Sequence, residues 1–497
     1  MPEVPPPRPV LDVLILGAGI SGIGCAAYLR RLMPQKTFGI LEMRGDLGGT
    51  WDLFRYPGIR SDSDLYTFAY EFKPWKSRNS MAAASEIKDY LEETADEYGI
   101  RDKISFGRKV IACDWSSDEG LWTVTAETGS GTEIWRCRWI FSATGYYDYD
   151  NGYRPDFPEE GAFAGQIVHP QAWPRDLDYA GRRVAVIGSG ATAVTLLPAL
   201  AEKAAHVTQV QRTPSYVLPL PKEDPLLKRL RPFFSANAVH KILRRKSIWQ
   251  QYIFYRLCRR FPKAMRNVIR KANVKSLPAG FPVDTHFNPP YDPWDQRLCF
   301  VPDGDLFKRL SDGSCSIVTG EVARLTKTGI EMEDGTHVAA DVIVTATGLN
   351  VKLAGGARYS LNGVPVDFSD RLIFKGLMLD GVPNLAISVG YTNSSWTLKV
   401  GLLCQYLCRL LSEMDQRGMD ICVPVRPARA MKTRPLLDFK AGYVQRALSR
   451  LPKQGDRFPW EMTANYREDE RMMKRGQVIV PELRLTAVPA RPLEAAE

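Results

Sequence analysis

The chain has 497 residues, of which 44% are hydrophobic and 25% are charged, and its formal net charge is +10. This length allows about three domains with buried cores, and the composition excludes a disordered, fibrous or disulfide-stapled protein. The nine cysteines are scattered without any C-x-x-C pair, so the sequence predicts neither a disulfide framework nor a metal site.

The N-terminal residues favour a cytoplasmic protein. They lack the cationic start, apolar run and small-residue cleavage site of a secretory signal. The apolar stretch 10–29 contains four glycines, which argues against a membrane span. Cysteines without partners also suit a reducing compartment.

A glycine-rich turn lies between a predicted strand, 10–16, and a predicted helix, 23–32. Gly17, Gly19 and Gly22 allow a tight turn, a close approach of backbone to a pyrophosphate and helix packing, and Ser21 stands among them. The next strand ends in Glu42, where a carboxylate accepts hydrogen bonds from ribose hydroxyls. This context predicts dinucleotide binding, with an ordinary glycine-rich turn as the alternative.

The same pattern recurs after a predicted strand over 184–187 and before a predicted helix over 194–200. The turn consists of Gly188, Ser189, Gly190, Ala191, Thr192 and Ala193, in which Ala193 is an allowed replacement for the third glycine. The following strand ends in Arg212 and Thr213, and a cation with a hydroxyl suits the 2′-phosphate of NADP. The alternative is a surface arginine at a strand end.

Two dinucleotide sites of different charge preference predict FAD in the first and NADPH in the second. The fold class is therefore α/β, with two Rossmann-like dinucleotide-binding domains. Two strands that end in Ala-Thr-Gly, 140–145 and 343–348, mark places where the chain crosses between them. No cysteine pair follows the first turn, which excludes a disulfide reductase and favours oxygen chemistry.

The positive charge is concentrated between Lys222 and Lys275, where 16 Lys and Arg stand against two acidic residues. This segment has a local charge of +14, which leaves −4 for the rest of the chain. Aromatic residues are interleaved with the cations. Three interpretations remain open: a helical insertion with a solvated basic face, a patch that contacts a membrane surface, and a nucleic-acid groove, of which we favour the first.

A further motif precedes the second glycine turn. Its residues have the spacing F-x-G-x-x-x-H-x-x-x-W-P and are Phe163, Gly165, His169, Trp173 and Pro174. This motif resembles the fingerprint of type I Baeyer–Villiger monooxygenases. A related family of flavin-dependent N- and S-oxygenating enzymes has a tyrosine and a basic residue in place of the final Trp-Pro, so the sequence sides with the Baeyer–Villiger branch.

The resemblance covers most of the chain and is strongest to the subgroup of ethionamide-activating monooxygenases. It is carried by GGTWDLFRYPGIRSDSD (48–64), HPQAWPRDLDY (169–179), IGSGATAVTLLPALA (187–201), DPWDQRLCFVPDGDLF (292–307) and GYTNSSWTLK (390–399). It implies an FAD domain over 1–148 and 346–497, an NADPH domain over 149–216 and 293–345, and a basic helical insertion over 217–292. It also implies that Gly49, Thr50 and Trp51 bind the flavin cofactor.

The resemblance implies a reaction as well. Reduced flavin reacts with O2 to give a peroxyflavin anion, which attacks a ketone and yields an ester or lactone, with sulfoxidation as a side activity. Arg297 matches the family's active-site arginine, a cation that would stabilise the anionic oxygens. Asp62 matches the carboxylate that pairs with it and also contacts the cofactor. The alternatives are a loop salt bridge for Arg297 and a helix cap for Asp62.

Other site residues follow from the same likeness. Trp396 opens a predicted helix over 397–411 and is expected, with Ser61, to line the substrate pocket, although core packing would also explain the tryptophan. Family members often have lysine where Gln296 stands, which weakens any role for that side chain in binding NADP. His169 and Trp173 are expected to control domain motion from an interdomain linker, and Trp460 to pack in the core.

Two other functions remain as alternatives. A flavin-dependent S- or N-oxygenating monooxygenase would share every cofactor residue and differ only in its product. A non-catalytic flavoprotein that tethers to a membrane would use the basic insertion alone. The expected partners are a small ketone or sulfide and O2, without nucleic acid and with peripheral membrane contact as an open option.

Overall fold

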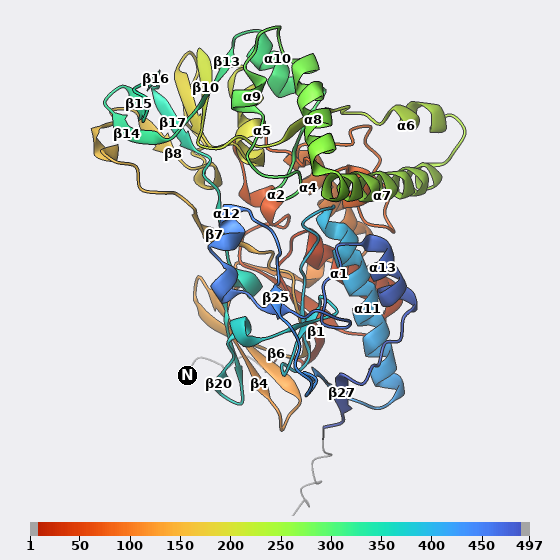
Figure 1. The fold of residues 1–497 in the computed structure, drawn as a ribbon. Coiled ribbons are helices and arrows are strands. Elements are labelled where there is room, and N and C mark those ends of the chain that lie inside the picture. The colour runs from red at the N-terminus through yellow and green to blue at the C-terminus, as the bar shows by residue number, and fades with distance from the viewer. Residues whose placement is uncertain (1–7, 489–497) are drawn as a thin grey trace, which may run out of the picture.

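The computed structural model describes residues 8–488, which form two lobes (Figure 1). The larger lobe contains an eleven-stranded sheet whose main path has the order β20-β19-β4-β5-β6-β1-β2-β3. Strand β23 (Leu385–Ile387) also pairs with β6 and leads to β22 (Met378–Leu379) and β21 (Ile373–Phe374). The strands of the main path are β1 (Leu11–Leu16), β2 (Phe38–Glu42), β3 (Ile104–Phe106), β4 (Lys109–Ser116), β5 (Leu121–Thr128), β6 (Gly131–Ser142), β19 (Arg358–Leu361) and β20 (Val364–Pro365).

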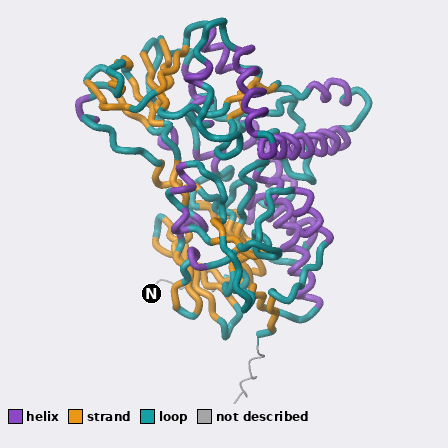
Figure 2. The backbone as a smooth tube through the Cα atoms, in the orientation of Figure 1, coloured by secondary structure: helices purple, strands orange, loops and turns teal. Residues whose placement is uncertain are grey.

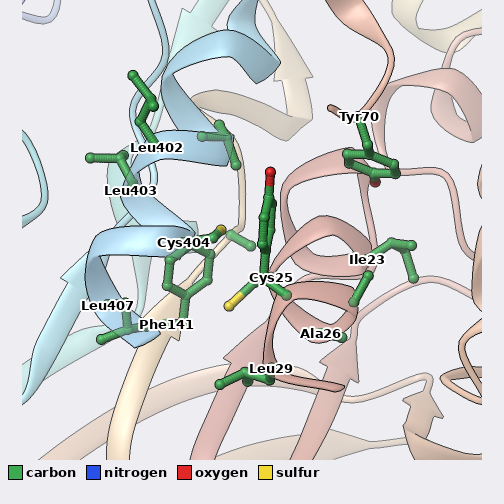
Figure 3. Packing of buried hydrophobic residues seen from close by; sticks show 14 of the residues in the cluster. Ile23, Cys25, Ala26, Leu29, Tyr70, Phe141, Leu402, Leu403, Cys404 and Leu407 are labelled. Atoms are coloured by element: carbon green, nitrogen blue, oxygen red, sulfur yellow. The ribbon is translucent and has the colours of Figure 1, made fainter. Parts of the chain in front are cut away.

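The centre of this sheet is buried on both faces. Strand β1 pairs in parallel with β2 and β6, and its continuous apolar sequence is typical of a strand covered from both sides. Helices α1 (Ile20–Leu32) and α11 (Trp396–Gln416) pack together on one face. Figure 3 shows Cys25 of α1 near Phe141 of β6 and Cys404 of α11. The turn that precedes α1 is thereby held on a rigid base.

Helix α11 extends beyond its predicted range of 397–411. Most of its residues from Thr397 to Leu411 are buried, and the partly exposed positions 401, 405, 409 and 412 follow one narrow stripe, so the helix is covered by protein on most of its surface. The helix ends at Gln416, shortly before Gly418, which has a φ of +63°.

The smaller lobe has a five-stranded parallel sheet of order β13-β10-β9-β17-β8. Helix α5 (Ala191–Leu200) connects β9 to β10, as in a dinucleotide-binding unit, and helix α10 (Asp305–Ser311) packs against α5. The molecule is therefore an α/β protein with two such units, as predicted. The strands are β8 (Gln166–Val168), β9 (Arg183–Ile187), β10 (His206–Gln211), β13 (Cys315–Thr319) and β17 (Val342–Thr345).

Two chain segments connect the lobes. They are β7 (Tyr147–Gly152) and β18 (Leu349–Val351), which form an antiparallel pair. Because the chain leaves the larger lobe through one and returns through the other, the larger sheet contains strands from both sides of the smaller lobe. The predicted domain boundary at 148 falls within β7 and the one at 346 shortly before β18, and the exact boundaries stay a prediction.

The basic segment forms helices α6 (Pro225–Leu230), α7 (Ala236–Arg260) and α8 (Pro262–Ser276), of which α7 extends along the outside of the molecule (Figures 1 and 2). Residues 217–220, inside the predicted helical insertion, instead form strand β11 (Val217–Leu220), which pairs with β12 (Cys299–Pro302). Helix α7 is attached to the larger lobe by buried Arg244, whose Nη1 donates to the carbonyls of Tyr66, Thr67 and Ala69.

The remaining elements are shorter and lie around these units. They include α2 (Thr50–Leu53), α3 (Leu65–Phe68), α4 (Ala84–Glu97), α9 (Val283–His286), α12 (Gly442–Gln445), α13 (Tyr466–Glu470), β14 (Val322–Thr326), β15 (Gly329–Met332), β16 (His337–Ala339), β24 (Ile421–Pro424), β25 (Arg434–Pro435), β26 (Lys453–Gln454) and β27 (Leu483–Thr486). Trp460 is buried in the core, as expected. All nine cysteines are buried and carry free thiols.

Candidate functional site

A cavity of about 320 Å³ lies where the two lobes meet. Its walls come from both glycine turns, from the loop that carries Asp62 and from the start of α11. The predicted site residues that line it are Gly17, Gly19, Ser21, Glu42, Gly49, Thr50, Trp51, Ser61, Asp62, Ala191, Thr192, Arg297 and Trp396. Segments that are far apart in the sequence therefore face one space.

The first glycine turn is tightly enclosed by protein backbone. Gly17 has a φ of +104°, and a Cβ there would lie 2.7 Å from the carbonyl oxygen of Ala143, so only glycine fits. Gly22 does not line the cavity; a Cβ there would lie 1.9 Å from the carbonyl oxygen of Gly17. It allows α1 to begin directly beneath the turn.

Glu42 stands at the end of β2 and is buried. Its Oε2 accepts the backbone N–H of Ala18 at 2.7 Å, and its Oε1 accepts that of Arg44 at 2.9 Å. Burial raises the pKa of this carboxyl, while the two N–H groups oppose the rise. Each oxygen of an ionised carboxylate can accept a second hydrogen bond, so the side chain has capacity for hydroxyl groups in the cavity.

The segment after β2 forms the facing wall. Gly49 has a φ of +57°, and a Cβ there would lie 3.0 Å from the Cα of Gly19. Thr50 begins the short helix α2, and its Oγ1 lies 3.3 Å from the hydroxyl of Tyr149. The two backbones thus come close together without side chains between them, as a site for a phosphate-bearing ligand requires.

Arg297 and Asp62 form an ion pair at the cavity wall, with Nη2 of the arginine donating to Oδ1 of the aspartate. The arginine side chain is 46% exposed because it faces the cavity, whereas that of Asp62 is 13% exposed. The carboxylate raises the pKa of Arg297, so this guanidinium is a permanent cation. Asp62 does not cap a helix; the N-cap of α3 is Asp64.

The loop that carries Arg297 is attached to two other parts of the chain. Asp295 binds Arg259 of α7, with Oδ1 and Nη1 2.8 Å apart, and Lys440, with Oδ2 and Nζ 3.0 Å apart. The backbone N–H of Lys440 also donates to the carbonyl of Asp295 at 3.1 Å. Both the helical insertion and the segment before α12 therefore help to place this loop.

The loop that carries Asp62 packs against the smaller lobe. Gly58 has a φ of +75°, and a Cβ there would lie 2.7 Å from the Cβ of Ala199 in α5. Arg60 binds Asp305 of α10, with Nη1 and Oδ2 2.6 Å apart. The position of Asp62 consequently depends on how the two lobes are docked.

Aromatic side chains that the sequence did not single out form a further wall. Tyr146 stacks on Trp396 with ring centroids 4.9 Å apart and on Tyr443 at 6.5 Å. The Tyr146 and Tyr147 hydroxyls are 2.8 Å apart, and Trp396 Nε1 donates to Ser21 Oγ at 3.1 Å. Tyr146 and Tyr147 directly follow the Ala-Thr-Gly turn at 143–145. That position is the sequence signal for them, although the turn by itself predicts only a domain boundary.

The second glycine turn is only partly enclosed. Gly188 has a φ of +143°, and a Cβ there would lie 2.3 Å from the carbonyl oxygen of Ala346, whereas a Cβ on Gly190 would meet nothing within 4 Å. Ser189 accepts a hydrogen bond from Ser215 at 3.0 Å. Arg212 is exposed and Thr213 is half-buried, and neither belongs to the cavity lining.

The fingerprint residues do not line the cavity, and Phe163 and Trp173 pack against apolar clusters of the smaller lobe. Gly165 leaves no room for a side chain, since a Cβ would lie 2.2 Å from the carbonyl oxygen of Asp341, and the nearby Phe163 is buried. Trp173, followed by half-buried Pro174, packs edge-on against Tyr179 with centroids 6.4 Å apart.

His169 lies between the two connecting segments. Its Nε2 is 3.2 Å from the carbonyl oxygen of Gly348, its Nδ1 accepts the N–H of Gln171 at 3.2 Å, and its ring fills the space beside Gly152. Burial lowers the pKa of this imidazole, so it is neutral at pH 7. This placement suits a role between the lobes rather than proton transfer in the cavity.

Comparison with known proteins gives consistent matches. Residues 70–354 match the family described as flavin-binding monooxygenase-like, and residues 15–80 match the NAD(P)-binding Rossmann-like domain. The FAD-containing monooxygenase EthA of Mycobacterium tuberculosis is 46% identical over 97% of this chain and 98% of its own length. The protein of that name from Mycolicibacterium smegmatis is 47% identical over 96% of this chain and 97% of its own length.

Solved structures show the same fold. An oxidised steroid monooxygenase bound to NADP aligns with a TM-score of 0.73 and 21% identity over 96% of this chain and all of that chain. An open structure of cyclohexanone monooxygenase aligns with a TM-score of 0.73 and 20% identity over 97% of this chain and all of its own.

Proposed function

This chain belongs to the flavin-binding monooxygenase-like family, and we propose that it is an FAD-containing, NADPH-dependent Baeyer–Villiger monooxygenase. Such an enzyme inserts one oxygen atom of O2 beside a ketone carbonyl and gives an ester or lactone. The observation that carries this proposal is the ion pair of Arg297 and Asp62 in the cavity that also contains the first glycine turn.

The residues of the first site fit FAD. The glycine backbones of 17, 19 and 49 leave a cradle that side chains would fill, and Glu42 has free acceptor capacity for ribose hydroxyls. Ser21, Thr50 and Trp51 line the same space. When bound and reduced, a flavin supplies the activation of O2 for transfer of one oxygen atom.

Arg297 holds positive charge where negative charge develops on oxygen. Conversion of a ketone carbonyl to a tetrahedral oxyanion concentrates charge on one atom, and a preorganised cation stabilises that state more than the ground state. Asp62 keeps the guanidinium directed along the cavity wall, while the arginine side chain retains its exposure to the cavity. Asp62 is therefore proposed to orient Arg297 and Arg297 to contact the reacting oxygen.

The second turn is proposed to hold NADPH. Gly188, Ser189 and Gly190 would approach its pyrophosphate, with Ala191 and Thr192 at the start of α5 on the cavity side. Arg212 and Thr213 would bind the 2′-phosphate at the exposed end of β10. His169, between the two connecting segments, would control how the lobes move when the dinucleotide enters.

Product identification tests the reaction class. The purified protein is mixed with NADPH, air and a panel of linear, cyclic and aryl ketones, and products are identified by mass spectrometry. Esters or lactones, each heavier than its ketone by one oxygen, are expected. Hydrogen peroxide as the only product in every reaction would contradict the proposal.

Oxygenation of sulfides is proposed as a second activity of the same site. Arg297 would stabilise negative charge on oxygen whichever atom receives the oxygen, so the cavity does not require a carbonyl. Aryl and alkyl thioethers in the same panel should give sulfoxides. Sulfoxides or N-oxides without any ester would favour the alternative, an S- or N-oxygenating monooxygenase.

We propose that the basic segment is a helical insertion with a solvated basic face, and peripheral contact with an anionic lipid surface is the alternative. In the loop between α6 and α7, Phe233 is 81% exposed beside Phe234 and Arg231, and the exposed face of α7 carries Trp249 among cations. Several cations of the segment are already bound within the fold, namely Arg244, Lys246, Arg259, Arg266 and Arg270, so the free charge is smaller than the sequence suggested.

Vesicle sedimentation tests this contact. No helix in the part of the chain that the structure describes is long and apolar enough to cross a bilayer. If the alternative is correct, binding to vesicles that contain phosphatidylserine should fall steeply with salt and should weaken when Phe233 and Phe234 are replaced by alanine. Absence of binding at low salt would leave the segment as a helical insertion with a solvated basic face.

A further inference from the structure

Two charged side chains behind the cavity wall are removed from solvent. Lys399, in the first turn of α11, and Asp469, in α13, are 1% and 0% exposed, and Nζ lies 2.6 Å from Oδ2. A buried ion pair loses hydration, and well-packed apolar side chains of similar volume usually stabilise a fold at least as well. Stability alone therefore does not account for this pair.

Tyr391 connects the pair to the cavity. Its ring lines the cavity, its hydroxyl donates to the same Oδ2 of Asp469 at 2.5 Å, and Nζ of Lys399 lies 5.5 Å from the ring centroid. Burial, together with the neighbouring Asp469, raises the pKa of Tyr391, so the hydroxyl keeps its proton and remains a donor. Asp469 consequently determines how this ring faces the cavity.

The hydrogen bonds of Asp469 are one-sided. Both donors bind Oδ2, whereas Oδ1 is buried and has no hydrogen-bond partner among the described residues. Gly376, with a φ of +67°, lies against the lysine stem, and a Cβ there would come within 3.1 Å of Cε of Lys399. The packing thus holds the lysine beside Oδ2 and leaves Oδ1 without a hydrogen bond. This arrangement fixes the position of the lysine although it does not satisfy both carboxylate oxygens.

We propose that Lys399 and Asp469 are positioning residues that hold Tyr391 and the start of α11 as one wall of the cavity. Tyr391, Thr392, Ser394 and Trp396 all line the cavity from one short segment, and Lys399 follows them by less than one turn of helix. The C-terminal helix α13 thereby helps to shape the site. This inference rests on the proposed function, which assigns the cavity to flavin and substrate.

Two variants separate positioning from stability. Tyr391→Phe removes only the hydroxyl, and the double variant Lys399→Met with Asp469→Leu replaces the pair by apolar side chains of similar volume. Each is purified with its flavin, and three quantities are measured: the visible circular dichroism of the bound flavin, the melting temperature, and the ratio of hydrogen peroxide to oxygenated product during NADPH oxidation.

The double variant should melt at or above the temperature of the unmodified protein, because apolar replacement of a buried pair is neutral or stabilising. Both variants should nevertheless change the flavin dichroism. Both should also raise the ratio of peroxide to product by about tenfold, the effect expected when a hydrogen bond to a charged group is lost. If the pair served stability alone, a variant that keeps its melting temperature would show unchanged flavin dichroism and an unchanged ratio of peroxide to product.

Lys375 provides a matched control. It is also a buried lysine, but its Nζ donates to the Tyr406 hydroxyl at 3.1 Å and to the Gln477 carbonyl at 3.0 Å, and it does not line the cavity. Lys375→Met should lower the melting temperature and leave the dichroism and the product ratio unchanged.

Unchanged dichroism and product ratio in both test variants would overturn the proposal, as would an equal change in Lys375→Met. Should one test variant fail to fold, the other decides by the same criteria. If the proposed function is wrong, the unmodified protein will form no oxygenated product. The dichroism of the bound flavin would still show whether Lys399 and Asp469 hold this wall of the cavity in place.

Discussion

The two glycine turns of this chain have similar sequences but differ in how far the fold encloses them. The first is pressed against backbone on several sides, and its acidic residue, Glu42, is buried. The second is open at Gly190, and its basic residue, Arg212, is exposed. An enclosed site suits a cofactor that stays bound, whereas an open site suits a dinucleotide that must enter and leave in every cycle.

Glycine substitutions should give the largest contrast between the turns. Gly17→Val places a side chain at a φ of +104° and against Ala143, so we expect a loss of about 3 kcal/mol in unfolding free energy and loss of bound flavin. Gly190→Ala meets no atom within 4 Å and should keep both fold and flavin, with a raised KM for NADPH. Flavin content, thermal melting and steady-state kinetics measure these effects. Equal flavin loss in both variants would contradict the contrast.

Arg297→Ala should abolish oxygen transfer to the ketone without affecting flavin binding. Loss of a preorganised charge donor typically lowers the rate by on the order of 10²–10³, so ester formation should almost vanish. The protein should stay yellow and folded, because the first turn, not Arg297, provides the enclosure. Reduction by NADPH should slow but persist, with hydrogen peroxide as the main product. Ester formation at nearly the normal rate would require another cation in the cavity.

Arg212→Ala tests the open turn. If Arg212 binds the 2′-phosphate, the preference for NADPH over NADH should shrink by about 1–3 kcal/mol, the range for hydrogen bonds to charged groups. Flavin content should not change, since Arg212 is remote from the cavity lining. The ratio of kcat/KM values for the two dinucleotides measures this. If the unmodified enzyme used NADPH and NADH equally well, the proposal that Arg212 binds the 2′-phosphate would be wrong.

Burial also has an electrostatic consequence at Asp64, which lies between α3 and α7. Its Oδ1 caps α3, its Oδ2 accepts a hydrogen bond from Ser247 of α7 at 2.7 Å, and burial raises its pKa to about 6. Because the folded state favours the protonated carboxyl, the resulting stabilisation is complete below about pH 4 and is lost as pH rises through about 6.

Asp64→Asn, which is neutral at every pH and still caps the helix, should therefore gain about 3 kcal/mol of unfolding free energy at pH 7 and almost nothing at pH 4. Urea unfolding at both pH values measures the difference. A gain of equal size at both pH values would mean that burial does not perturb Asp64.

Local patterns made much of the fold predictable. Each nucleotide turn is encoded within about 30 residues by a strand, spaced glycines and a helix, and both units have this order, although each helix begins three residues earlier than predicted, within the glycine motif. The pairing of Arg297 with Asp62, 235 positions apart, was expected only from the family resemblance. Spacing alone carries no information about such a contact.

Other parts of the site had no local signal. Tyr443 reaches the cavity from a short helix whose position depends on the surrounding fold, and Asp469 meets Lys399 across 70 residues of chain. The sequence did not predict strand β11 at the start of the helical insertion, because its partner, β12, lies some 80 residues away. Contacts of this kind arise only when the lobes and the insertion are assembled.

Asp295 limits how this molecule can be recombined with its relatives. Asp295 attaches the loop that carries Arg297 to α7 and to the segment before α12, and Trp294 of the same loop packs edge-on against Tyr255 of α7. A chimera whose exchanged insertion had no cation at position 259 would lose one partner of Asp295, and one whose exchanged C-terminal segment had none at position 440 would lose the other. Functional chimeras therefore need the loop, the insertion and the C-terminal segment to be transplanted from one parent as a matched set.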